Sequence, residues 1–357
     1  MSVVFFSGAE CGSLSVLEDK WESTTGTVGV QGTVVYTGNY AYYTNTSTNS
    51  YLQKTVNFKQ LSGAWQCADA SGTAVKVIEL YDGVTLRAEL EVIVSGDTAV
   101  LRITGGTGSG VGVDSFSQFS LVLTNSTTLD LKSSSGAIKS TLTIASTTQF
   151  SKIRIGHTSI ATGYTHYWDD IILSDNITDT IANSRIILRK VKAGTPTYDA
   201  FTKVGGATID LVWADVPYAT GTYATAADVD GTGYAQTALI NAFSTGGYAA
   251  TSVDTIVAAK IGLVGKYTSE FEGQRAIRRI VSAATTDTDL SGVVTASDAY
   301  YETAFFTATL SALDAMEIGA YLFGISGEDF RVEDEWAQLA YISNSVATGI
   351  PIYMAGD

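Results

Sequence analysis

Two adjacent carboxylates, Asp169 and Asp170, stand between an aromatic pair and the aliphatic run 171–173. Neighbouring side chains of a strand point to opposite faces, so one acid is expected to face inward and the other solvent. A buried carboxylate needs a metal, a cation or several N–H donors to offset its lost hydration. The pair could therefore serve as a catalytic acid, as a calcium ligand or as a solvent-facing feature of the strand.

Glu10 is a candidate partner for this pair, because the first and last strands of small sandwiches often meet. A calcium ion at such a seam would take a carboxylate from each end together with carbonyl oxygens. Glu10 with Asp169 or Asp170 is therefore a candidate structural calcium site. An arginine, a lysine or backbone donors could satisfy the acids instead, and the sequence leaves these alternatives open.

A second candidate calcium site lies within residues 287–298. Asp287, Asp289 and Ser291 place oxygens at alternate positions, and Asp298 occupies the twelfth. This spacing matches a calcium-binding loop, in which alternate oxygens wrap one cation. The last ligand is aspartate instead of the longer glutamate, and the flanks predict strands, so a polar hairpin loop explains the same pattern.

Catalytic constellations are weak in this chain. His157 and His166 lie in strand-like segments, and no nucleophile elbow followed by a helix accompanies them. Glu89 and Glu91 share one face of a predicted strand, where a glycosidase could use two carboxylates. The other face of that strand is apolar, so a solvated outer face explains the glutamates more simply. We therefore predict that the protein is not an enzyme.

Tyrosines cluster in the Thr/Asn-rich segment 36–51. Tyr40, Tyr42 and Tyr43 are candidate ligand-binding residues, because exposed tyrosines beside amides suit stacking and hydrogen bonding with sugars. Tyrosine is also enriched at protein interfaces. Packing of alternate tyrosines into a core is a third interpretation of the same cluster.

Period-two alternation predicts the elements that must position these residues. Apolar and polar residues alternate in several segments, as expected for half-buried antiparallel strands. Turn signals containing glycine separate them, and short strands at this spacing are typical of a β-sandwich. The clearest alternating segments of the first half are 86–92, 140–144 and 152–155, and its turns are 81–83, 95–97 and 134–136. We expect Trp21, Trp65 and Trp168 in the core of this half.

The second half begins after a polar boundary at residues 176–183 and also reads mostly as strands. One helical turn is predicted at 311–316, with Ser311 as N-cap and Asp314 as capping-box acid. The strands of this half are expected at 184–189, 207–213, 252–264, 276–282, 300–307 and 317–322. The fold class is thus all-β, with two antiparallel, jelly-roll-like β-sandwich domains at residues 1–178 and 184–357.

Composition narrows the class of protein further. The chain has 357 residues, a formal net charge of −15 and 45% hydrophobic residues. It is therefore expected to be globular, and its acidity opposes binding to nucleic acid. No segment approaches the roughly 18 apolar residues of a membrane helix, and no signal peptide is recognised. Cys11 and Cys67 are expected to be buried residues in a reduced compartment, although a disulfide also fits.

The first half resembles the concanavalin A-like, laminin-G-type sandwiches of bacteriophage structural proteins. The resemblance rests on an opening segment, a central hairpin and a closing strand, over roughly residues 1–176. These segments are FFSGAECGSLSVLEDKW, QFSLVLTNSTTLDLKSSSGAIKSTLTI and SKIRIGHTSIATGYTHYWDDIILSD. The aromatic-Asp-Asp-aliphatic ending of that family is matched by Trp168, Asp169, Asp170 and Ile171. The resemblance implies that the pair closes the first sandwich, with one acid at the seam and the other in solvent.

The second half is similar to the sandwich that often follows in such phage proteins, on RIILRKVKAGTPTYDAFTKVGGATIDLVWADVPYATGTYAT and TATLSALDAMEIGAYLFG. The resemblance implies a non-enzymatic component of a tailed-phage virion, a capsid decoration, head fibre or tail accessory protein, assembled in the host cytoplasm. Its expected partners are other virion proteins, further copies of this chain through sheet edges, and a host-surface glycan. No cofactor beyond structural calcium is implied. The alternatives are a carbohydrate-binding module and, with less support, a glycosidase.

Overall fold

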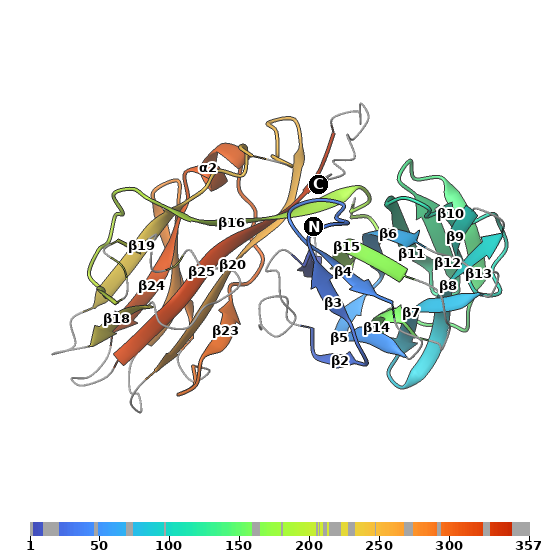
Figure 1. The fold of residues 1–357 in the computed structure, drawn as a ribbon, viewed down its shortest axis with the longest axis horizontal. Helices are drawn as coiled ribbons and strands as arrows, with labels where there is room; N and C mark the ends of the chain where they lie inside the picture. Colours follow the sequence, from blue (N-terminus) through green and yellow to red (C-terminus); the bar gives the residue numbers. More distant parts are fainter. Residues whose placement is uncertain are drawn as a thin grey trace. The chain divides into compact units, whose positions relative to one another are not determined.

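The computed structural model is built almost entirely of antiparallel strands (Figure 1), with 63% of the described residues in strands and 2% in helix. The all-β prediction is therefore confirmed. The structure describes residues 3–9, 21–45, 49–68, 74–95, 98–158, 165–179, 181–204, 206, 208–209, 213, 223–227, 233–246, 248–267, 274–290, 294–323 and 329–344. No helix among them is long and apolar enough to span a membrane.

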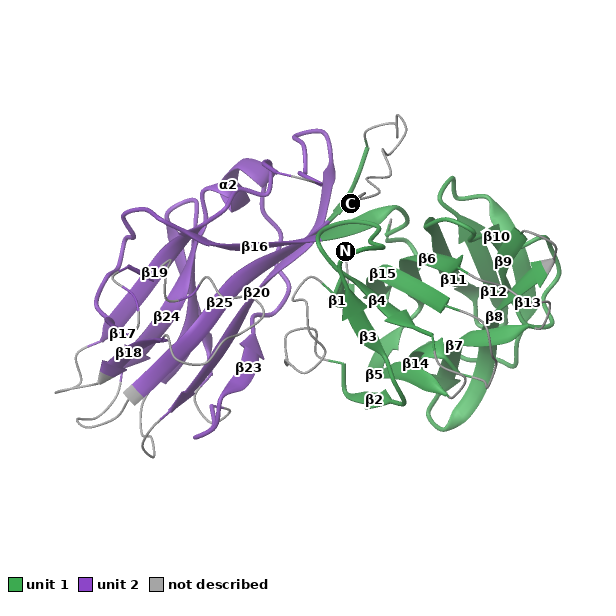
Figure 2. Ribbon diagram, in the orientation of Figure 1, with its two compact units in different colours: residues 1–14, 19–186, 341–357 green, residues 15–18, 187–340 purple. Residues whose placement is uncertain are grey.

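The chain forms two compact units (Figure 2). The first comprises Met1–Leu14, Asp19–Ile186 and Tyr341–Asp357, and the second comprises Ser15–Glu18 and Ile187–Ala340. The main division thus falls after Ile186, a few residues beyond the polar segment in which we expected it. The C-terminal residues group with the first unit, whereas the sequence placed them in the second. The boundaries after Ile186 and after Ala340 lie inside continuous strands, so composition carries no signal for them.

Two antiparallel sheets build the first unit. One has the order β13 (Ile138–Thr143), β12 (Thr128–Ser133), β11 (Ser117–Asn125), β6 (Gln60–Ala68), β15 (Thr165–Ser174), β4 (Ala41–Thr44) and β3 (Gly29–Gln31), and β1 (Val3–Ser7) pairs with β15. The other has the order β10 (Val111–Gly112), β9 (Thr98–Ile103), β8 (Thr85–Ser95), β7 (Val75–Asp82), β14 (Phe150–His157), β5 (Ser50–Phe58) and β2 (Ser23–Thr25). Strands distant in sequence therefore become neighbours, notably β14 between β7 and β5.

The alternating pattern of β8 explains how the second of these sheets faces the core. Ala88, Leu90 and Val92 are at most 5% exposed and belong to the core cluster. Glu89 and Glu91 lie on the other face of the strand, where each meets a cation. Burying a large aliphatic side chain contributes roughly 1.5–3 kcal/mol, so this alternation fixes the register of the strand.

A row of aromatic side chains lies on the core side of the first sheet, the one that contains β6, β15 and β4. Trp168 of β15 is the cross-strand neighbour of Trp65 on β6 and of Tyr42 on β4. Its ring stacks on that of Trp65 at 5.5 Å and on that of Tyr42 at 5.8 Å. All three side chains are 0% exposed, and Trp21 packs against the same core while partly buried. The expected core tryptophans are thus confirmed.

The second unit contains a further antiparallel sheet system. Its strands follow the order β17 (Thr202–Val204), β18 (Tyr223–Ala227), β25 (Asp329–Ile342), β16 (Ser184–Lys192), β19 (Tyr234–Ile240), β24 (Glu317–Phe323), β21 (Gln274–Val281) and β22 (Ala284–Asp289), and β20 (Thr255–Tyr267) pairs with β25 and with β23 (Ala299–Glu302). The predicted strand at 207–213 falls mostly outside the described residues. The other predicted strands of this half overlap observed ones.

The predicted helical turn is present as α2 (Leu310–Asp314), but its cap differs from the expected one. Thr309 is the N-cap, and its hydroxyl accepts a hydrogen bond from the Ala312 N–H. The helix therefore begins before Ser311. Asp314 caps nothing in its own helix, because its carboxylate accepts from the N–H groups of Phe243 and Ser244.

Candidate functional site

The aspartate pair of β15 is wholly buried, which corrects the expectation that one acid faces solvent. Asp169 and Asp170 are both 0% exposed. Between Asp169 and Ile172 the pairing with β6 shifts by one residue, and Asp170 has a φ of 53°. This is a β-bulge, in which one extra residue interrupts the alternation of faces. Both side chains can therefore turn inward.

Backbone donors satisfy Asp169. Its Oδ2 accepts from the N–H groups of Tyr36 and Thr37, both at 3.2 Å, and its Oδ1 accepts from the N–H of Asp170 at 2.8 Å. A carboxylate that receives several N–H bonds keeps its charge at low energetic cost. Asp169 thereby fixes the segment before β4 to the bulge in β15.

Asp170 has different partners. Its Oδ2 accepts from the Thr37 hydroxyl at 2.6 Å, and its Oδ1 accepts from the Ile186 N–H at 2.8 Å. Burial raises the pKa of Asp170 to about 7, while the Thr37 and Ile186 bonds and the charge of Arg185 act in the opposite direction. Glu10, the third member of the proposed calcium seam, lies outside the described residues, so that site stays a prediction.

The second candidate calcium site is divided among separate ion pairs. Asp287 lies in β22 directly opposite Arg278 of β21, and the two form a bidentate pair with both contacts at 2.7 Å. Asp298 pairs with Lys266 at 3.1 Å. Asp289 ends β22, and Ser291 lies outside the described residues. The residues 287–289 are thus a strand and not the loop that the spacing required. Among the described residues, no group of three or more His, Cys, Asp or Glu could hold a metal ion.

The three candidate tyrosines have different environments. Tyr42 is a core residue whose phenol contacts the Ser7 hydroxyl at 2.5 Å, as the core-packing interpretation of the cluster predicts. Tyr43 lies on the opposite face of β4, half-buried, 6.4 Å from the ring of Tyr167. Tyr40 is half-buried and packs against the core. Alternation along β4 therefore separates residues that the sequence grouped.

The two histidines are buried together. The rings of His157 and His166 meet edge to face at 4.7 Å, and the Trp65 indole donates to His166 Nδ1 at 3.2 Å. Burial lowers the pKa of His166 well below its usual value, and the neighbouring His157 adds to this shift. His166 is thus a buried, hydrogen-bonded residue of β15. Cys67 is likewise buried, and Cys11 lies outside the described residues.

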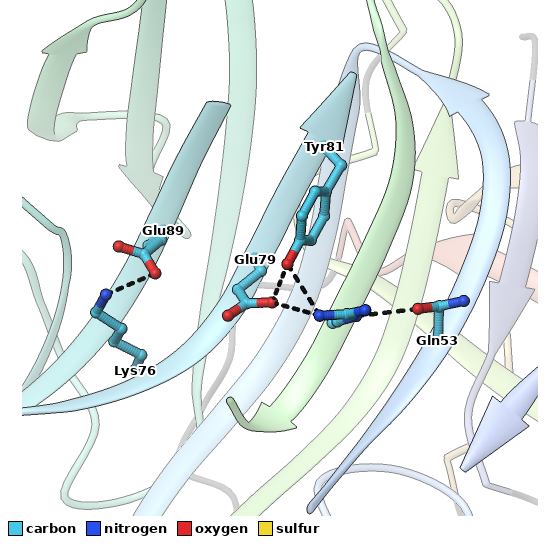
Figure 3. A network of polar contacts seen from close by, with 6 residues as sticks. Gln53, Lys76, Glu79, Tyr81 and Glu89 are labelled. Carbon is cyan, nitrogen blue, oxygen red and sulfur yellow. Dashed lines mark hydrogen bonds and ion pairs between the residues drawn. The ribbon is translucent and has the colours of Figure 1, made fainter. Parts of the chain in front are cut away.

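A row of polar side chains crosses four strands of the sheet that contains β8 (Figure 3). Gln53, Arg154, Glu79 and Glu89 are successive cross-strand neighbours on β5, β14, β7 and β8. We call this row, together with Lys76, Tyr81, Glu91 and Arg102, the polar ladder. Cross-strand neighbours on one face lie about 5 Å apart, so the row presents closely spaced polar groups.

Hydrogen bonds connect the middle of the polar ladder. Arg154 donates to Gln53 Oε1 at 3.0 Å, to the Tyr81 phenol at 3.0 Å and to Glu79 Oε2 at 3.3 Å. The Tyr81 hydroxyl donates to the same Glu79 oxygen at 2.5 Å. Burial, with the hydrogen bond to Glu79, raises the pKa of Tyr81 to about 12, so this phenol remains a donor at neutral pH.

Cations neutralise the other carboxylates of the polar ladder. Lys76 Nζ lies 2.7 Å from Glu89 Oε1, and Arg102 lies 2.8 Å from Glu91 Oε1. Lys76 and Arg102 are each 40% exposed, whereas Glu89 and Glu91 are 16% and 10% exposed. Solvent therefore meets the cationic ends, and the carboxylates lie beneath them.

Aromatic rings flank the centre of the polar ladder. The Arg154 guanidinium lies 4.8 Å from the ring centre of Tyr51 and 5.1 Å from that of Tyr81. The Lys152 ammonium lies 4.0 Å from the Tyr81 ring centre. The face thus combines donors, acceptors and ring surfaces, which can serve recognition of a hydroxyl-rich ligand.

Only part of this face was recognised from the sequence. Glu89 and Glu91 stand out because they alternate on one strand. Glu79, Tyr81 and Arg154 were missed, because they join Glu89 only through the placement of β14 beside β7. Segment 76–91 carries acidic residues between apolar ones, and segment 152–154 carries basic residues on either side of an isoleucine. This opposite charge on two predicted strands is the signal that could have suggested a cross-strand charge ladder.

Comparisons with known proteins found distant structural similarity only. No family model and no curated protein matches the chain. Among solved structures it is similar to an apo Crh5 transglycosylase, with a TM-score of 0.33, 17% identity and coverage of 48% of this chain and 85% of that one. It is also similar to domain 4 of AbnA, an arabinanase from Geobacillus stearothermophilus in complex with arabinotriose (TM-score 0.35, 10% identity, 50% and 94% coverage).

A third similar structure is a carbohydrate esterase from the Shiga toxin-encoding bacteriophage phi24B, with a TM-score of 0.36, 14% identity and coverage of 48% of this chain and 99% of that one. The chain spans about half the length of the botulinum neurotoxin receptor-binding domains that it also matches. TM-scores and identities this low carry no information about ligand or activity.

Proposed function

We propose that the chain is a non-enzymatic binding component of a tailed-phage virion, and that its first unit binds carbohydrate across the polar ladder. The observation that carries the carbohydrate part is the continuous row from Gln53 through Arg154 and Glu79 to Glu89. Sugar hydroxyls both donate and accept hydrogen bonds, and this row offers both kinds of partner at strand spacing. The rings of Tyr51 and Tyr81 supply apolar faces for the sugar ring.

The same geometry favours binding over hydrolysis. A glycosidase needs one carboxyl group that donates a proton and a second that acts as base or nucleophile. In the polar ladder Glu79, Glu89 and Glu91 already contact Arg154, Lys76 and Arg102, respectively, at 3.3, 2.7 and 2.8 Å. Each carboxylate is thus engaged by a cation of the chain itself, whereas a glycosidase needs two carboxyl groups that face the scissile bond.

The virion part of the proposal rests on the sequence resemblance to phage structural proteins. The sheet edges at β3, β13, β2 and β10 in the first unit give further copies or other virion proteins a place to add strands. Mass spectrometry of purified particles should find this chain in stoichiometric amounts. Its absence from particles made by cells that express it would refute this part.

Binding to a glycan array tests the carbohydrate part. Wild-type protein should bind neutral oligosaccharides on the array. Tyr81→Ala or Arg154→Gln should weaken that binding about tenfold or more, as expected when about 1.4 kcal/mol of binding free energy is lost. Lys132→Gln, on β12 of the other sheet, is the matched control for loss of one charge and should leave binding unchanged. No retained glycan, or equal loss in the control, would contradict the proposal. Polysaccharide turnover that disappears in Glu89→Gln would show an enzyme instead.

A further inference from the structure

A second recognition site lies in a pocket of the first unit that shares no residue with the polar ladder. The pocket has a volume of about 490 Å³, within the roughly 300–1,000 Å³ of small-molecule sites. Its lining residues come from the loop before β4, from β10, from the start of β11 and the loop before it, from the β12–β13 turn, from the start of β16 and from Ser343 after β25. All of them belong to the first unit.

The charge of this pocket is opposite to that of the chain. The protein has a net charge of −15, yet the described residues that line the pocket include Arg185 and no aspartate or glutamate. Among the residues that the structure describes, Arg185 forms no ion pair within 4.0 Å. The groups that act on its guanidinium include the phenols of Tyr36 and Tyr341.

Asp170 is the acid whose charge acts on Arg185. Both of its carboxylate oxygens already accept hydrogen bonds, from Thr37 and from the Ile186 N–H. Burial raises the pKa of Asp170 to about 7, so a substantial fraction of it is uncharged at neutral pH. Because Asp170 is already hydrogen-bonded and forms no ion pair with it within 4.0 Å, the Arg185 guanidinium can direct N–H donors to a ligand in the pocket.

The walls combine aromatic rings with fixed polar groups. The rings of Tyr36 and Phe116 lie 5.7 Å apart, and the Arg185 guanidinium lies 5.9 Å from the Tyr36 ring centre. The three consecutive serines 133–135 supply hydroxyls from the β12–β13 turn. Asn183 holds that turn, because its side-chain amide donates to the Ser134 carbonyl at 2.7 Å.

We infer that this pocket binds an acidic monosaccharide, of the uronic or sialic acid type, with its carboxylate on Arg185. A guanidinium presents parallel N–H donors that match a carboxylate, and one unpaired cation matches one negative charge. The faces of Tyr36 and Phe116 would cover the sugar ring, and the serine hydroxyls would meet its hydroxyl groups. This inference uses none of the residues of the polar ladder, so either site can fail without the other.

Ligand-observed NMR and calorimetry on the full chain test the inference. The probes are glucuronic acid and N-acetylneuraminic acid, with glucose as the neutral control and inorganic phosphate as the alternative anion. At least one acidic sugar should bind, while glucose and phosphate should bind at least tenfold more weakly at this pocket. Binding of neither acidic sugar, or binding of glucose or phosphate that is equally strong and equally lost in Arg185→Gln, would overturn the inference.

Variants locate the binding. Arg185→Gln should weaken acidic-sugar binding tenfold or more, and Arg185→Lys, which keeps the charge but loses the planar fork, should weaken it less. Arg279→Gln, on β21 of the second unit, removes the same charge outside both proposed sites and should have no effect on it. Circular dichroism checks the fold, and Phe116→Ala, which leaves Arg185 in place, supplies a second loss of binding. Unchanged affinity in Arg185→Gln, or an equal loss in Arg279→Gln, would refute the assignment.

Discussion

Substitution of Asp170 by asparagine separates the charge of this buried residue from its hydrogen bonds. Asparagine keeps an oxygen that can accept from the Ile186 N–H, and its amide can donate to the Thr37 hydroxyl, which accepts as readily as it donates. Asparagine also tolerates the φ of 53° at this position. The variant should therefore preserve the bulge while removing a desolvated carboxylate.

The sign of the effect follows from the pKa of Asp170, which burial raises from 3.8 to about 7. Below the pKa of Asp170 in the unfolded chain, the carboxyl group is protonated in both the folded and the unfolded state, and its ionisation costs no stability. As pH rises from about 4 to about 7 the unfolded chain ionises first, so stability falls. At about 1.4 kcal/mol for each pKa unit, the loss reaches roughly 4 kcal/mol as an upper bound. Asp170→Asn should thus be about 1–4 kcal/mol more stable than wild type at pH 8 and nearly equal at pH 4.

Asp169→Asn is the matched control. Asp169 only accepts hydrogen bonds, from the N–H groups of Tyr36, Thr37 and Asp170. An amide there would direct its own N–H groups at backbone donors, so we expect a loss of about 1–3 kcal/mol at every pH. Scanning calorimetry from pH 4 to pH 8 measures both variants, and hydrogen exchange assigns the transition to the first unit.

Equal destabilisation of the two variants at pH 8 would refute this reasoning. It would mean that Asp170 is required as a charge, as it would be if it bound a cation together with Glu10. A wild-type transition that shifts upward on addition of calcium and downward with a chelator would support that alternative directly.

Three further substitutions test the packing of the two units. Glu335→Gln should raise the melting temperature of the second unit at pH 7 and leave it unchanged near pH 3. Burial, with the neighbouring Asp334, raises the pKa of Glu335 well above its usual value. In addition, neither of its oxygens has a hydrogen-bond partner in the described structure. Gly319→Ala should cost roughly 2–3 kcal/mol in urea unfolding, since a Cβ there would lie 1.9 Å from the backbone oxygen of Gln236. Tyr42→Phe should cost about 1–3 kcal/mol in the first unit, because the Ser7 and Trp21 side chains lose the phenol; an unchanged midpoint would contradict the hydrogen bonding described for it.

Local alternation predicted the elements well because it depends on neighbours along one strand. Leu90 and Val92 turn inward in β8 as their spacing requires. The same rule failed at Asp170, where a bulge inserts one residue, and nothing in the flanking sequence marks that insertion. Tyr42 and Tyr43 were grouped as one cluster because they are neighbours in the sequence. As neighbours in β4 they point to opposite faces of the sheet, so they cannot act together.

Long-range pairing limited the prediction of sites. Asp287 matched a calcium-loop spacing, yet its partner is Arg278, which faces it across a hairpin. The polar ladder depends on β14 lying between β7 and β5, and the pocket depends on β16 starting near the β12–β13 turn. Period-two patterning fixes which residues face outward but not which strands become neighbours, so these constellations required the structure.

The contrast between Arg154 and Arg185 connects the two proposed sites. Both arginines lie over a tyrosine ring, but Arg154 is neutralised by Glu79 at 3.3 Å, whereas Arg185 has no carboxylate within ion-pair distance among the described residues. The first arrangement presents balanced donors and acceptors and should prefer neutral, hydroxyl-rich ligands. The second leaves one cation for an anionic group. Two surfaces of one sandwich would then read different parts of a mixed glycan, and linked occupancy would raise avidity without any new contact.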